Sequence, residues 1–153
     1  MRKEALRAAL VARLEADLAT ARAAHDAAIE GATHEEARPE NDKDTRGLEQ
    51  SYLARGLAQR VAELEAAVAA VPAMTLAKPG RVAIGAVVTV EEEARETRFF
   101  IAAHGGGVVL PGEVTVITPT SPIGRALLGR VVDDECELTA GGKRRTLVVV
   151  RID

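Results

Sequence analysis

The chain has 153 residues, a length that suits one medium domain or two small ones. Apolar residues make up 47% of it but aromatic residues only 2%, so its cores must be aliphatic and a deep ligand pocket lined with aromatic rings is not expected. The net charge is −3, with the acidic excess in residues 1–77 and no visible basic stripe for phosphates, which disfavours autonomous binding of DNA or RNA.

Cysteine usage and the start of the chain predict the compartment. Cys136 is the only cysteine, so an intrachain disulfide and a thiolate zinc site are both excluded. The first ten residues, MRKEALRAAL, are charged and helical in character and lack the apolar run of a signal peptide. No stretch approaches the roughly 18 consecutive apolar residues of a membrane span. We therefore expect a cytoplasmic protein with no membrane partner.

The first half of the chain predicts two long helices. Apolar positions recur at spacings of three and four, which places one stripe on a helix of about 25–30 residues that stops at Gly31. The stripe consists of Leu6, Leu10, Leu14, Leu18, Ala21, His25 and Ala28. A second helix, ended by Pro72, carries an a/d seam formed by Leu57, Val61, Leu64, Val68 and Val71, and widened towards Leu48, Tyr52 and Leu53. Neither stripe can remain in water, so residues 1–73 are predicted to form an antiparallel coiled-coil hairpin.

The second half changes to the period of β-strands after a linker at residues 74–80, where Pro79-Gly80 is a turn signal. Residues 81–90, 96–102 and 105–119 are rich in β-branched and aromatic side chains and predict strands. Residues 135–153 predict a hairpin with Gly141-Gly142 at its turn. Residues 81–153 are therefore expected to form a small sheet domain, and the whole chain an α+β protein.

One short helix interrupts the strand pattern. Ser121 is a good N-cap, Pro122 suits the first helical position, and Gly129 closes the helix. The sheet is expected to pack on this helix.

The segment around this helix resembles a known family. Residues 117–138 read ITPTSPIGRALLGRVVDDECEL and are followed by a Gly-Gly pair and a terminal apolar strand. This pattern resembles the C-terminal domain of the bacterial Gre transcript-cleavage factors, which are GreA/GreB-like transcription elongation factors. The matching signature is Ser121-Pro122-Ile123, Leu127-Leu128-Gly129-Arg130 and Asp133-Asp134. The resemblance implies an FKBP-like antiparallel fold for residues 81–153, and the preceding hairpin is the other half of the family's architecture.

The resemblance also implies a function. Gre factors dock their C-terminal domain at the rim of the RNA polymerase secondary channel, and here the docking residues would be Ser121, Pro122, Ile123 and Arg130. They insert the hairpin into the channel, where acidic tip residues help hold Mg²⁺ and a water in the polymerase's own active site, and backtracked RNA is cut. The chain would thus stimulate the polymerase's RNA cleavage without being an enzyme itself.

The segment between the two helices supplies the expected tip carboxylates. They are Glu36, Glu40, Asp42 and Asp44. Mg²⁺ prefers oxygen ligands, so Glu40 and Glu36 are expected to share a metal that the polymerase mainly holds. Asp42 and Asp44 have a second explanation, because they follow Pro39 near the expected start of the second helix, where a carboxylate stabilises a helix by ~0.3–1 kcal/mol.

The tip departs from the family pattern at one position. Aligning on Glu49-Gln50 brings Glu40-Asn41 onto the family's Glu-Asn, but Ala37 then occupies the family's aspartate position. Glu36 immediately precedes Ala37 and is the nearest carboxylate that could take the place of this aspartate. This departure supports an alternative function, a secondary-channel regulator of transcription initiation that does not cleave RNA.

Three further readings concern the second half. Lys143-Arg144-Arg145 is either a solvated turn or a surface for an acidic region of the polymerase. Cys136 fits a buried small hydrophobic residue. A prolyl isomerase is disfavoured, because Phe99 and Phe100 are adjacent on a strand and must point to opposite faces, so they cannot line one pocket.

Overall fold

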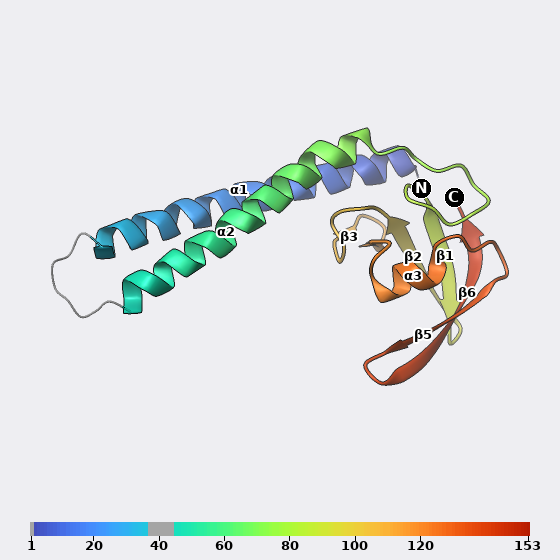
Figure 1. The fold of residues 1–153 in the computed structure, drawn as a ribbon. Coiled ribbons are helices and arrows are strands. Elements are labelled where there is room, and N and C mark those ends of the chain that lie inside the picture. The colour runs from blue at the N-terminus through green and yellow to red at the C-terminus, as the bar shows by residue number, and fades with distance from the viewer. Residues whose placement is uncertain (1, 37–44) are drawn as a thin grey trace. The chain divides into compact units, whose positions relative to one another are not determined.

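The computed structural model describes residues 2–36 and 45–153, in two compact units. One unit comprises Ala12–Ala69, and the other comprises Met1–Val11 together with Ala70–Asp153. Two long helices, α1 (Lys3–Glu36) and α2 (Thr45–Ala70), precede six strands and the short helix α3 (Pro122–Leu127) (Figure 1). The predicted α+β class, a helical hairpin followed by a small sheet domain with one short helix, is confirmed.

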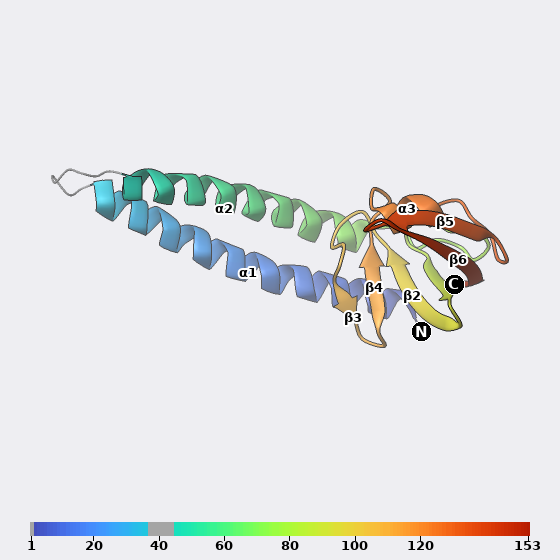
Figure 2. The same ribbon diagram turned by 90° about the horizontal axis from the view of Figure 1, so that it is seen from below.

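The hairpin unit is held by the apolar stripes of its two helices. Figures 1 and 2 show α1 and α2 side by side along this unit. The buried side chains of the unit are Leu14, Leu18, Ala21 and Ala28 on α1, and Leu64 and Ala67 on α2. An ion pair of 3.5 Å between Arg22 Nη2 and Glu65 Oε2 also joins the helices. The predicted stripe on the first helix is therefore confirmed, with His25 only half-buried.

Two details of the hairpin differ from the sequence predictions. Gly31 does not stop the first helix, because α1 continues to Glu36. A glycine inside a helix costs about 1 kcal/mol relative to alanine, an amount that a long, already propagating helix tolerates. The predicted seam is also not packed at the N-terminal end of α2. Tyr52 is 57% exposed there, and Leu48 and Leu53 are exposed as well. Ile29 of α1 is also exposed, so the apolar side chains there do not bury one another.

The sheet has the strand order β3-β4-β2-β1-β6-β5. Its strands are β1 (Val87–Glu92), β2 (Arg95–Ile101), β3 (Val109–Leu110), β4 (Val114–Ile117), β5 (Glu135–Ala140) and β6 (Lys143–Ile152). All neighbouring strands are antiparallel except β2 and β4, which are parallel. A parallel pair needs a crossover connection of about a dozen residues or more, and residues 102–113, which include β3, provide it (Figure 2).

One face of the sheet forms the main core with α3. Its buried side chains come from β1, β2, β4, β5, β6 and α3, and include Val88, Val90, Phe99, Ile101, Cys136, Leu147 and Leu127. Phe100 lies on the opposite face and is fully buried as well. The two phenylalanines therefore do point to opposite faces, as the strand period predicts.

The first turns of α1 belong to the sheet unit. Leu6 and Leu10 are fully buried, and Leu10 packs against the backbone at Gly105. The Lys3 ammonium donates to the carbonyl of Ala77, and Arg7 Nη1 donates to the carbonyl of Met74 at 2.7 Å. These contacts join the start of the chain to the segment that leads into the sheet.

The strand predicted at residues 81–90 begins only at Val87. Gly85 has a φ of +90°, and a methyl group on it would lie 2.2 Å from the carbonyl oxygen of Thr75. The Gly85 carbonyl accepts a hydrogen bond from the Ala77 amide at 3.1 Å, and the Gly85 amide donates to the Ile101 carbonyl of β2 at 2.8 Å. The backbone here therefore bridges the linker and the end of β2 and does not yet form β1. The predicted turn at Gly141-Gly142 is confirmed, with φ values of 60° and 77° that match a type I′ hairpin.

Candidate functional site

The motif at the start of α3 is organised by the hydroxyl of Ser121. Its Oγ accepts a hydrogen bond from the Gly124 amide at 3.0 Å and donates one to the Thr118 carbonyl at 2.8 Å. Pro122 occupies the first turn, where its missing N–H costs nothing. The predicted N-cap is therefore confirmed, and the hydroxyl is engaged within the chain. This geometry fits a residue that shapes the motif.

Gly124 makes the closest backbone approach in the motif. A methyl group at this position would lie 1.8 Å from the Thr118 carbonyl oxygen, so only glycine fits. Gly124 was not among the predicted site residues, since a glycine inside a predicted helix carries no local signal of such a contact.

The end of the motif is fastened to the segment that precedes β1. The Gly129 amide donates to the Val82 carbonyl at 2.8 Å, and the Val82 amide donates to the Arg130 carbonyl at 2.9 Å. Arg81 Nη1 adds a bond of 2.7 Å to the Gly129 carbonyl. Gly129 has a φ of +83°, which suits the glycine predicted to close the helix. Three hydrogen bonds therefore hold the turn at Gly129 and Arg130 against residues 81 and 82.

The motif presents both apolar and cationic groups to solvent. Leu128, Val131 and Val132 are exposed, and within the described residues the Arg130 side chain makes one hydrogen bond, from Nε to the Ala126 carbonyl at 3.1 Å. Ile123 is half-buried against the core. Ile123 and Arg130 were predicted to lie in the docking surface, but the three exposed aliphatic residues were not, because their exposure depends on the fold and cannot be seen from residue type.

The predicted tip lies mostly beyond the described part of the chain. Glu40, Asp42 and Asp44 are outside the described residues, as are Pro39 and Ala37. Glu36 is the last residue of α1. Residues 2–36 and 45–153 contain no group of three or more His, Cys, Asp or Glu side chains that could hold a metal ion. The tip carboxylates and their share in a Mg²⁺ site stay predictions.

The basic cluster beside the β5–β6 turn is largely neutralised within the chain. Arg144 Nη2 lies 2.7 Å from Glu137 Oε2, and Arg145 donates two bonds of 2.7 Å to the carboxylate of Glu92. The hydrogen bond from Arg145 lowers the pKa of Glu92, and the same bond raises the pKa of Arg145. Lys143 is the one member without an ion pair in the described residues, which favours the reading of a solvated turn.

Two further findings concern predictions made from composition. Cys136 is fully buried in the core, as predicted, and this burial raises the pKa of its thiol. Among the helices of the described residues, none combines the length and apolar character needed to cross a membrane.

Comparison with known proteins relates the chain to transcription factors. Residues 77–153 match the family described as "Transcription elongation factor, GreA/GreB, C-term". Among solved structures, "GreA factor homolog 1 (Gfh1) protein of Thermus thermophilus" is 22% identical, with 94% of each chain covered and a TM-score of 0.42. "Prokaryotic transcription elongation factor GreA/GreB from Nitrosomonas europaea" is 28% identical, with 50% of this chain and 63% of that chain covered and a TM-score of 0.39. A search of curated proteins found no match.

Proposed function

Because this chain belongs to the GreA/GreB family of transcription elongation factors, we propose that it binds RNA polymerase through the secondary channel and stimulates cleavage of backtracked RNA. The observation that carries the proposal is a carboxylate-rich segment, residues 36–44, which connects the two helices of the hairpin. In this proposal the protein acts as a cofactor-like stimulator of a cleavage reaction that takes place in the polymerase's own active site.

A hairpin of this kind suits delivery of charge into a buried site. The part of α1 that lies in the hairpin unit, residues 12–36, corresponds to a rod about 38 Å long at ~1.5 Å per residue. Helices that are paired through buried side chains such as Leu14, Leu18 and Leu64 are stiffer than a free chain, so less conformational entropy is lost when the hairpin binds.

The carboxylates of the connecting segment provide the chemistry. Glu40 and Glu36 have the hard oxygen donors that Mg²⁺ prefers. When bound, Mg²⁺ lowers the pKa of a coordinated water and neutralises charge that develops at a phosphodiester. The role of the chain's own carboxylates is to add one or two anionic ligands to a metal that the polymerase mainly holds. Asp42 and Asp44 contribute to the local negative field.

The α3 motif supplies the docking surface. Ser121 and Pro122 set its shape, and Ile123 supports it from the core side. The exposed Leu128, Val131 and Val132 and the free part of the Arg130 guanidinium form the contact region. An apolar patch with one arginine is typical of an interface centre.

A second function is favoured by Ala37. This residue occupies the position at which the family's tip has an aspartate, so the tip has one carboxylate fewer at its expected place. A factor with a weakened tip enters the same channel and inhibits or modulates initiation without cleaving RNA.

A single assay separates the two functions. Purified polymerase stalled in a backtracked complex with 3′-labelled RNA is incubated with the protein at neutral pH in Mg²⁺. Release of short 3′ fragments above the rate of the polymerase alone supports the cleavage factor. Lower promoter output with no fragment release supports the regulator. If the protein does not bind polymerase at all, both proposed functions are ruled out.

A further inference from the structure

Two arginines with a threonine between them form a row across the sheet, here called the basic row, on the face opposite the core cluster. Thr89 of β1 lies between its two cross-strand partners, Arg98 of β2 and Arg151 of β6. Two residues further along β1, Glu91 lies opposite Glu96 of β2. Because residues i and i+2 of a strand are about 7 Å apart, the charge changes from basic to acidic over a short distance on one face.

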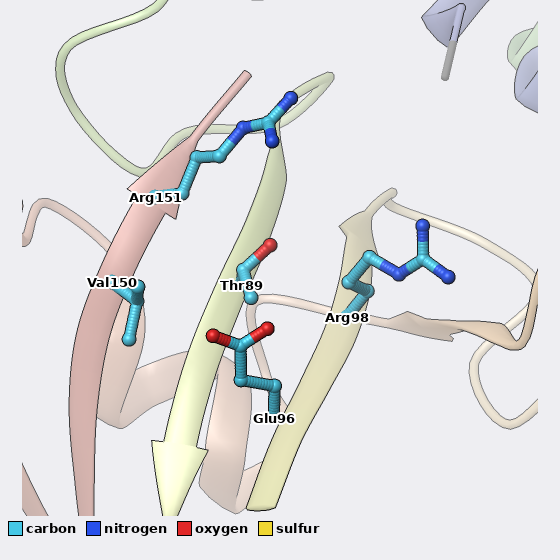
Figure 3. Close-up of a pocket in the computed structure, with 5 residues that line it drawn as sticks. All are labelled: Thr89, Glu96, Arg98, Val150 and Arg151. Carbon is cyan, nitrogen blue, oxygen red and sulfur yellow. The ribbon is translucent and has the colours of Figure 1, made fainter.

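A hollow lies over the basic row (Figure 3). It has a volume of about 380 Å³ and is lined by Thr89, Glu96, Arg98, Val150 and Arg151. A second hollow of about 130 Å³ shares Thr89, Arg98 and Arg151 and extends to Val87, Val114 and Asp153. The same three polar side chains therefore border both hollows.

The polar groups of this row have unused hydrogen-bonding capacity. Thr89 is only 8% exposed, and the described residues provide no hydrogen-bond partner for its hydroxyl. Arg98 Nη2 donates to the Gly112 carbonyl at 2.5 Å, and Arg151 Nε forms an ion pair with Asp153, 3.2 Å from Oδ1 and 2.9 Å from Oδ2. Each guanidinium has five N–H groups, so both retain donors for a ligand.

The spacing of the row suits one tetrahedral oxyanion. Strands lie about 4.8 Å apart, so the backbones of Arg98 and Arg151 are about 10 Å apart across Thr89. An anion placed over Thr89 therefore has one arginine on each side, and the Arg98 side chain, which reaches the Gly112 carbonyl in the structure, turns toward Thr89 to contact it. Figure 3 shows the Thr89 hydroxyl directed away from the neighbouring Glu96 carboxylate, with the Arg151 guanidinium beyond the hydroxyl and the Arg98 guanidinium extending away from Thr89.

We propose that Arg98, Thr89 and Arg151 form an oxyanion site that binds the phosphate group of a small phosphorylated ligand such as a mononucleotide. A terminal phosphate has three acceptor oxygens, one for each of the three donors, whereas a carboxylate has two. This site uses neither the hairpin nor the α3 motif, so it is independent of the function proposed above.

The acidic neighbours select a small ligand over a nucleic-acid strand. A polynucleotide carries a negative charge every few ångströms, so a strand running along β1 would meet Glu91 and Glu96 beside the basic row. Asp153 lies beside Arg151 on the other side of the hollow. These carboxylates would repel a continuous polyanion, whereas a single phosphate held by the arginines would avoid most of this repulsion.

The site is tested by titrating the full ¹⁵N-labelled chain with inorganic phosphate at constant ionic strength and following its amide resonances. Saturable shifts are expected at Thr89, Arg98 and Arg151, and a mononucleotide should give the same shifts. Arg98→Gln and Arg151→Gln should each weaken binding about ten-fold or more, since each removes charge-assisted hydrogen bonds. Thr89→Val, which keeps the side-chain shape, should weaken it several-fold.

Two variants serve as controls. Arg144→Gln removes one positive charge from the distant β5–β6 hairpin, and it should leave phosphate binding unchanged. Glu96→Gln should strengthen binding several-fold, because it removes a repulsive charge from the hollow.

Several outcomes would overturn the proposal. They are non-saturable shifts, equal weakening by Arg144→Gln, and acetate binding as tight as phosphate binding. Tighter binding of a single-stranded RNA oligomer than of the mononucleotide at the same residues would assign the surface to nucleic acid and would also overturn it.

Discussion

Arg145 of β6 donates two parallel hydrogen bonds to Glu92 of β1, from Nε to Oε2 and from Nη2 to Oε1, both 2.7 Å long. The pair links two residues 53 positions apart. The hydrogen bond lowers the pKa of Glu92. A carboxylate with a lowered pKa in the folded state contributes stability above its unfolded pKa, and this contribution is lost as the pH falls through the folded pKa.

Arg145→Gln should therefore lower the free energy of unfolding at pH 7 by about 0.5–1 kcal/mol, a value kept small because both side chains are partly exposed. The difference from the wild type should shrink at acidic pH, as Glu92 becomes protonated on passing its lowered folded-state pKa. Urea unfolding followed by circular dichroism at both pH values measures it. Arg144→Gln is the control, since its more exposed pair with Glu137 should contribute less. A difference that is the same at both pH values would contradict the linkage.

Gly124→Ala should destabilise the sheet unit by about 1–3 kcal/mol, because the new methyl group would collide with the Thr118 carbonyl. Gly56→Ala is a matched control in α2, where nothing lies within 4 Å of the added methyl group. That variant should be neutral or more stable by up to about 1 kcal/mol, since alanine favours helix. Thermal unfolding compares the two variants. Equal melting temperatures would refute the role given to Gly124.

The Cys136 thiol should react slowly with a maleimide reagent in the folded protein. Burial removes access and raises the pKa of the thiol, which lowers the thiolate fraction at neutral pH. Labelling followed by mass spectrometry should show modification that accelerates strongly in urea. Rapid labelling in buffer alone would show that the core around β5 opens readily.

Glu40→Ala should abolish fragment release from a backtracked complex while polymerase affinity changes by no more than a few-fold, because the connecting segment acts at the active site and not in docking. Glu36→Ala, assayed beside it, reports whether Glu36 replaces the carboxylate that is absent at Ala37. A parallel loss of affinity and cleavage in the Glu40 variant would contradict this division of labour.

Ile123→Asp should lower the free energy of unfolding by about 2 kcal/mol or more, because it places a charge against the core, and polymerase binding should fall with it. Val132→Asp changes an exposed neighbour and should alter stability by less than about 0.5 kcal/mol. Its effect on polymerase affinity, measured with the stable variant, separates docking from folding. Unchanged affinity would exclude Val132 from the contact region.

Local features of this protein were predictable from its sequence. The Ser121 cap joins groups three residues apart, and the Gly141-Gly142 turn depends on the φ values that glycine allows, so neighbouring residues suffice. The stripe on α1 was predictable for a similar reason, since a helix repeats every 3.6 residues and the pattern itself shows which face is buried. The resemblance of the α3 motif to the Gre factors also lay in consecutive residues.

The tertiary structure alone decided features that depend on residues distant in the chain. It placed Leu6 and Leu10 in the sheet unit, aligned β4 parallel to β2, and left Val131 exposed beside α3. The alignment of Arg98, Thr89 and Arg151 in one row likewise follows from strand register, which includes an irregularity between Thr89 and Val90. Register and exposure are set by the packing of the whole chain, so periodicity within one segment does not specify them.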